Sequence, residues 1–239
     1  MQTAEILLFE ALKKIKINLL DSTMGKLLEF LKLMLEMNQT TNLTAITDYQ
    51  EALIKHLYDA LLILTLPVFQ NVTKIIDIGS GGGIPAVPLA IVAPEKEIFS
   101  LEATQKKIRF QQEAVDKLKL TNFKPIWGRA EELAHDLKYR EQYSLVTARA
   151  VATCNVLTEL TFGFAEIGGT VVFYKGQDYQ IELSQAKQAV AKMGGELVGV
   201  AEFFLPQNYG ARALIELRKV KITPLEYPRK PGIPNKKPF

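Results

Sequence analysis

The stretch IIDIGSGGGIPAVPLAI, residues 75–91, limits the possible folds of this chain more than any other segment. An apolar run ends near Asp77, a glycine-rich turn follows, and small and apolar residues resume behind it. A strand that passes through a glycine-rich turn into a helix is typical of ligand-binding α/β sheets. Such a turn can hold a dinucleotide, a triphosphate or a sulfonium cofactor such as S-adenosylmethionine.

Strand-like and helix-like segments alternate from residue 74 onward. This alternation predicts an α/β fold with a mostly parallel sheet built from right-handed crossovers. A helix-like stretch over residues 155–167 is expected to end at Gly168 and Gly169, since glycines often close helices. The last two strand-like segments lie close enough in sequence to pair antiparallel. The expected strands are 74–79, 97–102, 123–128, 144–149, 170–175, 196–205 and 213–220.

The first 70 residues are expected to form an N-terminal helical extension. Amphipathic helices are predicted over 4–20 and 24–37, followed by the polar break NQTTN. In the next helix-like stretch, Asp48 and Glu51 stand at capping-box spacing. A chain of 239 residues is long enough for one sizeable α/β domain with such an extension. We therefore divide the chain into the extension (1–70), the α/β domain (71–221) and a C-terminal tail (222–239).

Positive charge is concentrated at the C-terminal end. Residues 218–239 contain seven basic residues and one acid, a charge of +6, whereas the net charge of the whole chain is +3. The remaining 217 residues therefore sum to −3. A basic, proline-rich tail on a nearly neutral body favours a polyanionic partner, and a merely solubilising tail is the alternative. The tail is expected to be extended and irregular, because it contains five of the eleven prolines.

The rest of the composition points to a cytoplasmic protein. The single cysteine, Cys154, cannot form an internal disulfide, which fits a reducing compartment. No window of eighteen uncharged apolar residues occurs, and Glu5 and Glu10 interrupt the N-terminal apolar pattern. We expect neither export nor a membrane span, and we assign no metal ligands.

A dinucleotide or a triphosphate fits the glycine turn poorly. Read from Gly79, the pattern GxGxxG fails at Ile84, and read from Gly81 only a looser form ending at Ala86 remains. The carboxylate of Asp77 would also repel a pyrophosphate in a partly dehydrated cleft. A triphosphate site needs a lysine followed by serine or threonine after the glycines, and the sequence has none there.

The carboxylate of Asp77 would attract S-adenosylmethionine instead of repelling it. It carries a sulfonium and an ammonium group, so an acid beside the turn is favourable, while exposed turn amides can meet its carboxylate. The D-x-G-x-G spacing of Asp77, Gly79 and Gly81 fits this cofactor. Glu102, at the end of the next strand, can accept hydrogen bonds from the ribose hydroxyls. Ala130 and Glu131 follow the third strand, where a cleft can receive the adenine.

Each of these residues also has a purely structural interpretation. Asp77 can cap the following turn, Glu131 can begin a surface helix, and the glycines can serve tight packing alone. Their joint spacing at three successive strand ends favours cofactor binding.

With these residues in place, the chain resembles a class I S-adenosylmethionine-dependent methyltransferase with a Rossmann-like sheet. More narrowly, it resembles the bacterial small-subunit ribosomal RNA guanine-N7 methyltransferases, RsmG, also called glucose-inhibited division protein B. The resemblance spans most of the chain and rests on NLTAI (42–46), KHLYDALLIL (55–64), the glycine turn, LEATQKKIRF (101–110), WGRAEEL, VTARAVA (146–152), YKG and YPRKPGIPNKKP.

The resemblance implies roles for particular residues. It assigns Gly79 and Ile84 to the cofactor at the glycine turn, Ala130 and Glu131 to its adenine side, and Arg149 to the end of the fourth strand. The sequence departs from the family at Ala86, where a second glycine is usual before the proline. It also departs at Tyr58 and Ala60, which stand where the family usually has an aliphatic residue and a serine.

The chemistry that the resemblance implies needs no catalytic base, because guanine N7 already presents a lone pair. We assign no catalytic residue and expect in-line positioning to suffice. Cys154 is expected to be a small buried thiol, and His135 an exposed side chain. His56 is either a packed histidine or a functional one. Arg149 at a strand end is costly without a partner, which makes it the strongest candidate for substrate or cofactor contact.

The implied partner is 16S ribosomal RNA, a 30S subunit or an assembly intermediate of that subunit, bound by a monomer. In the tail, Tyr227 and Phe239 suit base stacking. A small-molecule methyltransferase, a non-catalytic RNA-binding protein and a nicotinamide-dependent dehydrogenase remain as alternatives. The candidate phosphate contacts are Arg229, Lys230, Lys236 and Lys237.

Overall fold

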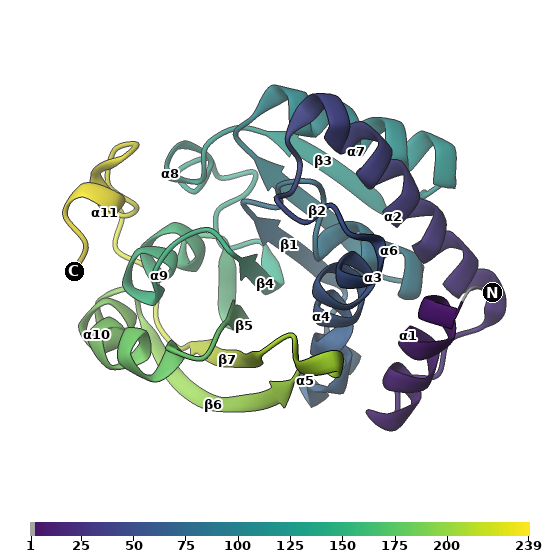
Figure 1. The fold of residues 1–239 in the computed structure, drawn as a ribbon. Coiled ribbons are helices and arrows are strands. Elements are labelled where there is room, and N and C mark those ends of the chain that lie inside the picture. Colours follow the sequence, from purple (N-terminus) through teal and green to yellow (C-terminus); the bar gives the residue numbers. More distant parts are fainter. Residues whose placement is uncertain (1–2) are drawn as a thin grey trace.

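A computed structural model describes residues 3–239, in which seven strands form one sheet (Figure 1). The strand order is β3-β2-β1-β4-β5-β7-β6. Strands β2 and β3 are therefore added on one side of β1, and β4 and the later strands on the other side. The strands are β1 Lys74–Ile78, β2 Glu97–Glu102, β3 Phe123–Trp127, β4 Tyr143–Arg149, β5 Ala165–Lys175, β6 Gly195–Phe204 and β7 Ala211–Lys219.

The first five strands are parallel, and β7 pairs antiparallel with both β5 and β6. The prediction of a mostly parallel sheet with antiparallel C-terminal strands is therefore confirmed. Parallel strands place their carboxyl ends at one edge, which brings the ends of β1, β2, β3 and β4 together. The candidate site residues of the sequence lie along this edge.

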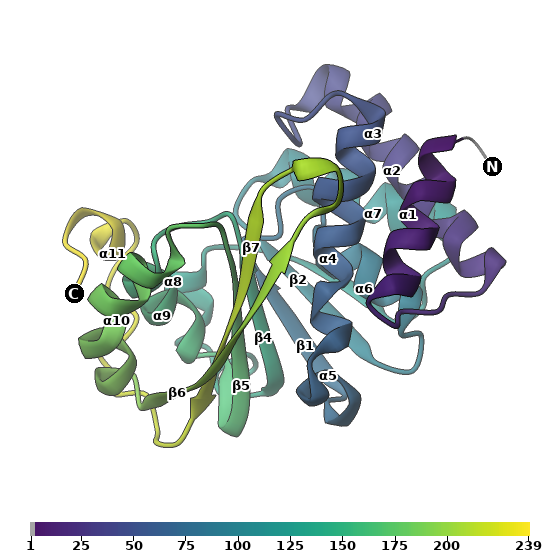
Figure 2. The same cartoon turned by 60° about the horizontal axis from the view of Figure 1, so that its bottom comes forward.

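Successive side chains of a strand point to opposite faces of the sheet, and they belong to two separate hydrophobic clusters, one on each face. In β1, Ile75 belongs to the first cluster and Ile76 to the second. The first is covered by the N-terminal helices with α6 and α7, and the second by α8, α9 and α10 (Figure 2). The covering helices are α1 Thr3–Lys14, α2 Asp21–Thr41, α6 Ala86–Val92, α7 Gln105–Leu118, α8 Ala130–Leu133, α9 Cys154–Phe162 and α10 Tyr179–Lys192.

The first 70 residues are helical as expected, apart from residues 1 and 2, which lie outside the described residues, but two helix ends differ. Helix α1 ends at Lys14, because Lys16 adopts a left-handed conformation (φ 64°). Helix α2 continues to Thr41, so the NQTTN stretch is mostly helical and not a break. Asn42 ends it in a left-handed conformation that asparagine tolerates. The extension shares one hydrophobic cluster with the sheet.

The segment after α2 is an irregular helix that runs along the sheet, from the carboxyl edge of the parallel strands to their amino ends (Figure 2). Asp48 accepts a hydrogen bond from the Glu51 amide (2.7 Å), so the predicted cap is present. A π-helical turn, where hydrogen bonds span one residue more than in an α-helix, separates α3 from α4. The pieces are α3 Tyr49–Ala52, the π-turn Leu53–Tyr58, α4 Asp59–Leu61, a 3-10 turn Leu62–Thr65 and α5 Pro67–Asn71.

The prediction that Gly168 and Gly169 close a helix is wrong. Helix α9 ends at Phe162, and both glycines lie inside β5. The pairing of β5 with β4 moves from Ala165 opposite Tyr143 to Thr170 opposite Leu145, so the glycines form a bulge. Gly168 has a φ of 85°, which only glycine adopts readily. Glycine is common both at β-bulges and at helix ends, so its presence in the sequence does not distinguish the two.

The C-terminal tail is irregular apart from the short helix α11 Ile233–Lys236, but it packs closely against α8 and α9. The buried guanidinium of Arg140 holds it by donating to the carbonyls of Thr223 (2.7 Å), Pro224 (3.2 Å) and Tyr227 (3.0 Å). Within residues 3–239, no helix is both long and apolar enough to cross a membrane.

Candidate cofactor site

A cleft of about 350 Å³ opens at the carboxyl edge of the sheet, above β1, β2 and β4. The glycine turn forms its floor, and the segment linking α2 to the π-turn forms its opposite wall. Its lining combines backbone, apolar and charged groups. The residues that line it are Met34, Leu43, Thr44, Ala45, Ile46, His56, Gly79, Ser80, Gly81, Gly82, Ile84, Glu102, Lys107, Arg149 and Ala150.

The glycine turn needs glycine at Gly79 for conformation and for space. Gly79 has a φ of 73°, and a Cβ there would lie 2.6 Å from the Val151 side chain. Gly81 also has a positive φ, of 60°, but a Cβ there would meet nothing within 4 Å. The turn therefore presents backbone to the cleft at Gly81, where a ligand can approach closely.

Most amides of the turn are already used inside the protein. The amides of Gly79 and Ser80 donate to the carbonyl of Leu101, and those of Gly83 and Ile84 donate to the carbonyl of Ser80. Exposed turn amides that meet a ligand carboxylate were expected, and at these four positions this expectation is wrong. The turn is rigid because its hydrogen bonds are internal.

Two side chains from β2 and α7 lock the turn further. Glu102 accepts from the Gly81 amide (2.9 Å) through one oxygen and from the Thr104 amide (2.7 Å) through the other. Gln111 donates to the Gly81 carbonyl (2.8 Å) and accepts from the Ser100 hydroxyl (2.7 Å). A carboxylate accepts about four hydrogen bonds, so Glu102 keeps acceptor capacity toward the cleft.

Asp77 is buried at the end of β1, below the turn. Its Oδ1 accepts from the Thr147 hydroxyl (2.7 Å), whereas its Oδ2 has no hydrogen-bond partner among the described residues. Burial raises the pKa of Asp77 to about 6, although the Ser80 and Thr147 hydroxyls and the Arg149 charge favour the ionised form. The buried Ser80 hydroxyl lies near this carboxylate but forms no hydrogen bond of standard geometry within the described chain.

Arg149, at the end of β4, is bound to a fully buried acid. Its Nε donates to Asp59 Oδ2 (2.8 Å), and its Nη2 donates to the Lys55 carbonyl (2.6 Å). The other oxygen of Asp59 accepts from Nε of Arg212 on β7 (2.7 Å). One carboxylate therefore joins the N-terminal segment to two strands of the sheet, and the predicted cost of an unpaired Arg149 is avoided.

His56 lies in the wall of the cleft, on the π-turn. Its Nε2 is 2.8 Å from the Thr44 hydroxyl oxygen, which itself accepts from the Ile46 amide (3.0 Å). Burial, and secondarily the charge of Arg149, lowers the pKa of His56 to about 3. His56 is therefore neutral at physiological pH and cannot supply a positive charge or act as a general acid there.

Ala130 and Glu131, at the start of α8, do not belong to the lining of this cleft. Both are buried, and Glu131 accepts a hydrogen bond from the Gly232 amide of the tail (3.0 Å). They follow β3 at the same sheet edge, beside the cleft, since the Gly128 amide donates to the Glu102 carbonyl (3.1 Å).

The four basic candidates of the tail have different surroundings. Arg229 forms a two-pronged ion pair with the buried Glu159 of α9, at 2.9 Å from Nε and 2.6 Å from Nη2. Arg229 therefore fastens the tail to the domain. Lys230, Lys236 and Lys237 are exposed, and their ammonium groups form no ion pair within residues 3–239.

The other chemically notable side chains stand apart from the cleft. Cys154 is buried at the start of α9, and burial raises the pKa of its thiol to about 12, so it is not a nucleophile at neutral pH. His135 is exposed, and its Nε2 contacts the Pro228 carbonyl (2.7 Å). The described part of the chain holds no group of acids, histidines and cysteines arranged for a metal ion.

Four functional side chains were not expected from the sequence: Asp59, Arg212, Thr147 and Gln111. One available signal was Asp59 itself, an acid inside the otherwise apolar run LYDALLIL. A charge at such a position is buried only with a partner. Its partners could not be named, because Arg149 and Arg212 lie 90 and 153 residues further along the chain.

The cleft and the buried Asp77 beneath it, which is not part of the cleft lining, fit S-adenosylmethionine. An acceptor without a partner, Asp77 Oδ2, lies beneath a turn that exposes backbone at Gly81. A free buried acceptor beside a cleft suits a cationic ligand and opposes a pyrophosphate. The second carboxylate, Glu102, lies one strand away with remaining acceptor capacity.

Replacing Asp59 by asparagine is expected to lower the free energy of unfolding by about 3–5 kcal/mol, because two guanidinium groups lose a buried charged partner. Urea unfolding measures this change. The matched control is Glu51→Gln, which weakens the half-exposed ion pair with Lys55 and is expected to cost under about 1 kcal/mol. Equal losses in the two variants would contradict the structural role of Asp59.

Comparisons with known proteins agree with this geometry. A sequence model described as rRNA small subunit methyltransferase G matches residues 23–208. Ribosomal RNA small subunit methyltransferase G from Leuconostoc citreum (strain KM20) is 39% identical over 231 residues, covering 96% of each chain. The protein of the same name from Dehalococcoides mccartyi (strain CBDB1) is 41% identical over 228 residues, covering 95% of this chain and 97% of that one.

Among solved structures, M. jannaschii TYW2 in complex with AdoMet is similar, with a TM-score of 0.54 and 16% identity over 74% of this chain and 80% of that one. At this identity the likeness concerns the fold alone, and it confirms the expected class I methyltransferase fold. The family match covers most of the chain, and the relatives cover nearly all of it. The chain belongs to the rRNA small subunit methyltransferase G family.

Proposed function

We propose that this protein transfers the methyl group of S-adenosylmethionine to N7 of a guanine in 16S ribosomal RNA. Family membership supports the enzyme class and the RNA substrate. The observation that carries the cofactor assignment is the buried Asp77 carboxylate, with one oxygen unpartnered, under the glycine turn. Guanine N7 follows from the resemblance to the guanine-N7 methyltransferases described above.

The proposed cofactor contacts follow the geometry of the cleft. Asp77 attracts the cationic end of the cofactor, and Glu102 accepts from the ribose hydroxyls. The turn supplies close backbone approach. Ala130 and Glu131, beside the cleft, receive the adenine side, and Arg149 closes the cleft from β4. The full set of proposed contacts is Asp77, Gly79, Gly81, Ile84, Glu102, Ala130, Glu131 and Arg149.

The surroundings of the reaction suit a transfer that needs no proton removal. When bound, S-adenosylmethionine supplies an activated methyl group. His56 is neutral and Cys154 is protonated and buried, so neither competes as a charged acid or a nucleophile. The chain then contributes a rigid floor at the glycine turn and a pinned Arg149, which hold the reactants in line.

RNA binding is assigned to the tail, with a division of roles among its basic residues. Lys230, Lys236 and Lys237 are exposed and available for phosphate contacts. Arg229 contributes indirectly, because its ion pair with Glu159 seats the tail. The proposed division of the chain is thus an N-terminal extension (1–70) that contributes one wall of the cleft, a domain (71–221) that carries the glycine turn, and the tail (222–239).

We further propose a monomer that acts in the bacterial cytoplasm on 16S ribosomal RNA within a 30S subunit or its assembly intermediate. A small-molecule methyltransferase is the alternative. The exposed tail lysines favour RNA, since a small acceptor has no use for a basic surface outside the cleft.

Methyl transfer tests the proposed function directly. Purified 30S subunits, naked 16S ribosomal RNA and a metabolite extract, all from cells lacking this gene, are incubated with radiolabelled S-adenosylmethionine. We expect label in the ribosomal RNA at 7-methylguanine, located by mass mapping. Label in metabolites alone, or cofactor binding without transfer to any RNA, would overturn the proposal.

Cofactor affinity is expected to depend on the ionisation of Asp77. Because the raised pKa lies at about 6, protonation below that pH removes the negative charge that attracts the cofactor. The Kd for S-adenosylmethionine should therefore rise by up to about tenfold for each pH unit below 6. Calorimetric titration between pH 5 and pH 7.5 measures this dependence.

Two variants provide the controls for this titration. Asp77→Asn should bind weakly with little pH dependence. Thr147→Val removes a hydrogen bond that favours the ionised carboxylate, so its transition should move to higher pH. A wild-type Kd that stays constant over this range would rule out the assigned role of Asp77.

Changing Lys230, Lys236 and Lys237 together to glutamine is expected to weaken binding to 16S ribosomal RNA and to lower its salt dependence. Three lost phosphate contacts should reduce the slope of log K against log salt by about 2–3. Filter binding at several salt concentrations measures the slope, and cofactor affinity should not change. The control changes Lys13, Lys14 and Lys26, exposed on α1 and α2. Equal slopes for both triple variants would refute the tail assignment.

A further inference from the structure

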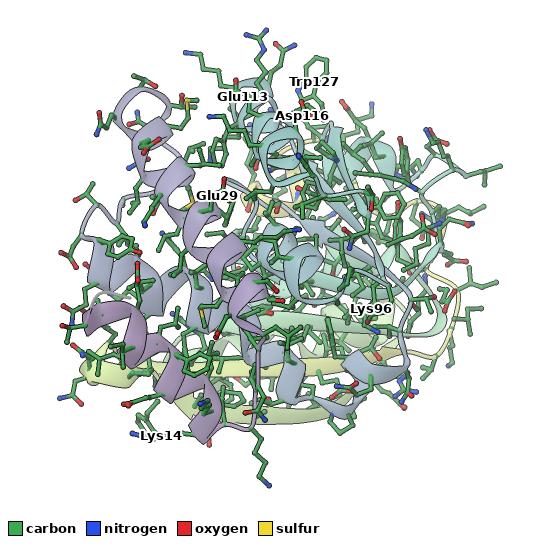
Figure 3. All side chains as sticks on the ribbon, turned by 90° about the vertical axis from the view of Figure 1, so that its right-hand side faces the viewer. Lys14, Glu29, Lys96, Glu113, Asp116 and Trp127 are labelled. Carbon is green, nitrogen blue, oxygen red and sulfur yellow. The ribbon has the colours of Figure 1, made fainter. Side chains whose placement is uncertain are left out.

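Trp127 is the only tryptophan of the chain, and its side chain is 61% exposed. Figure 3 shows it projecting outward at the periphery of the molecule. Tryptophan is usually well buried, and its exposure in a monomeric unit often marks a binding surface. No aromatic partner covers the ring among the described residues.

The ring is nevertheless held in place. Its indole N–H donates to the Ala103 carbonyl (3.0 Å), in the residue that follows the cleft-lining Glu102. Glu102 is also the partner of Trp127 in the register of β2 and β3. The exposed ring therefore stands directly beside the proposed cofactor cleft, and its polar group is satisfied by the protein. Because the ring is already fixed, its side chain loses little conformational entropy when a ligand stacks on its face.

The ring lies on the α7 side of the sheet. Side chains alternate between the two faces of a strand, so Trp127 points to the same face of β3 as Phe123 and to the opposite face from Ile126. Phe123 packs in the cluster covered by α7, whereas Ile126 packs in the cluster on the α8 side. Ala130 and Glu131, the proposed adenine contacts, belong to α8. The Trp127 face is thus separate from the position proposed for the adenine.

Exposed cations occupy the segments that flank the ring. Lys106 and Arg109 lie in the first turns of α7, which begins two residues after Ala103, and Arg129 lies two residues after Trp127. Within residues 3–239, none of the three forms an ion pair. Exposed aromatic rings with unpaired cations form the surfaces that bind single-stranded nucleic acid, because bases stack on the ring while the cations meet phosphates.

We propose that Trp127 is a stacking platform for an unpaired base of the ribosomal RNA substrate, with Lys106, Arg109 and Arg129 on the flanking phosphates. This inference rests on the proposed RNA substrate and extends it to the RNA conformation that the enzyme accepts. A base that enters the cleft has to leave the stack of its neighbours, so unpaired bases of the same strand are free to bind the ring.

The fluorescence of the single tryptophan reports on this contact in the unmodified protein. The probes are a fluorescein-labelled ten-nucleotide oligoadenylate, the same strand in an RNA duplex, and S-adenosylmethionine alone. We expect saturable quenching of Trp127 by the unpaired strand, much less by the duplex, and none by the cofactor. The proposal is overturned if the unpaired strand binds, by anisotropy, without quenching, or if S-adenosylmethionine alone quenches fully.

Variants test whether the contact contributes to affinity. Trp127→Ala should weaken binding of the unpaired strand by about 5-fold to 150-fold, the contribution of one base stack. It should raise the KM for 30S subunits and leave the Kd for S-adenosylmethionine within twofold. Trp127→Tyr should restore most of the affinity. The control is Leu20→Ala, another exposed apolar side chain, at 75% exposure before α2.

The outcomes separate the two proposals. If Trp127→Ala binds the strand as the wild type does, or if Trp127→Tyr is as weak as Trp127→Ala, the platform is refuted even when ribosomal RNA is methylated. If no RNA is methylated, the proposed function fails, and the quenching and anisotropy measurements still decide whether Trp127 binds an unpaired base.

Discussion

A single buried carboxylate connects the parts of this protein that build the cleft. Asp59 accepts from Arg149 at the end of β4 and from Arg212 on β7, so an irregular N-terminal helix is tied to two strands of the sheet. Arg149 in turn donates to the Lys55 carbonyl, which places the π-turn and His56 over the glycine turn. Because all these charges are largely removed from water, each depends on the others for compensation. The N-terminal segment is therefore a wall of the site as well as a cover for the hydrophobic core.

The glycine turn, which forms the floor of the cleft, is rigid because its hydrogen bonds are made to groups within the protein. The turn amides bind neighbouring carbonyls, and Glu102 and Gln111 hold Gly81 from two sides. Three buried polar atoms around the cleft lie outside this closed network and have no hydrogen-bond partner among the described residues: Asp77 Oδ2, the Ser80 hydroxyl and His56 Nδ1. A buried acceptor without a donor costs free energy in the free protein, and a cationic ligand recovers it. The proposed selectivity for a sulfonium cofactor thus rests on the negative charge of Asp77, whose Oδ2 has no hydrogen-bond donor among the described residues.

Much of the fold and part of the site could be predicted from local patterns. The alternation of strands and helices, the Asp48 cap and the spacing of Asp77, Gly79 and Gly81 depend on neighbours within a few residues, and the structure contains all of them. The wrong predictions concern short sequence patterns that are compatible with two different local structures. Gly168 and Gly169 form a bulge instead of a helix end, and NQTT continues a helix instead of ending it. The polar residues 38–41 remain helical because the buried Leu31 and Met34 of α2 already anchor that helix to the core.

The sequence by itself determined the class of sheet, the glycine turn and the acid before it, since strand periodicity and turn chemistry are properties of short segments. Only the tertiary structure decided which charges meet. Arg149 and Asp59 are 90 residues apart in the chain, and Arg229 and Glu159 are 70 apart. The sequence marks each as a charge in need of a partner, but the strand order selects that partner. For this reason Arg229, one of four similar cations in the tail, became its anchor, while the three lysines remained exposed.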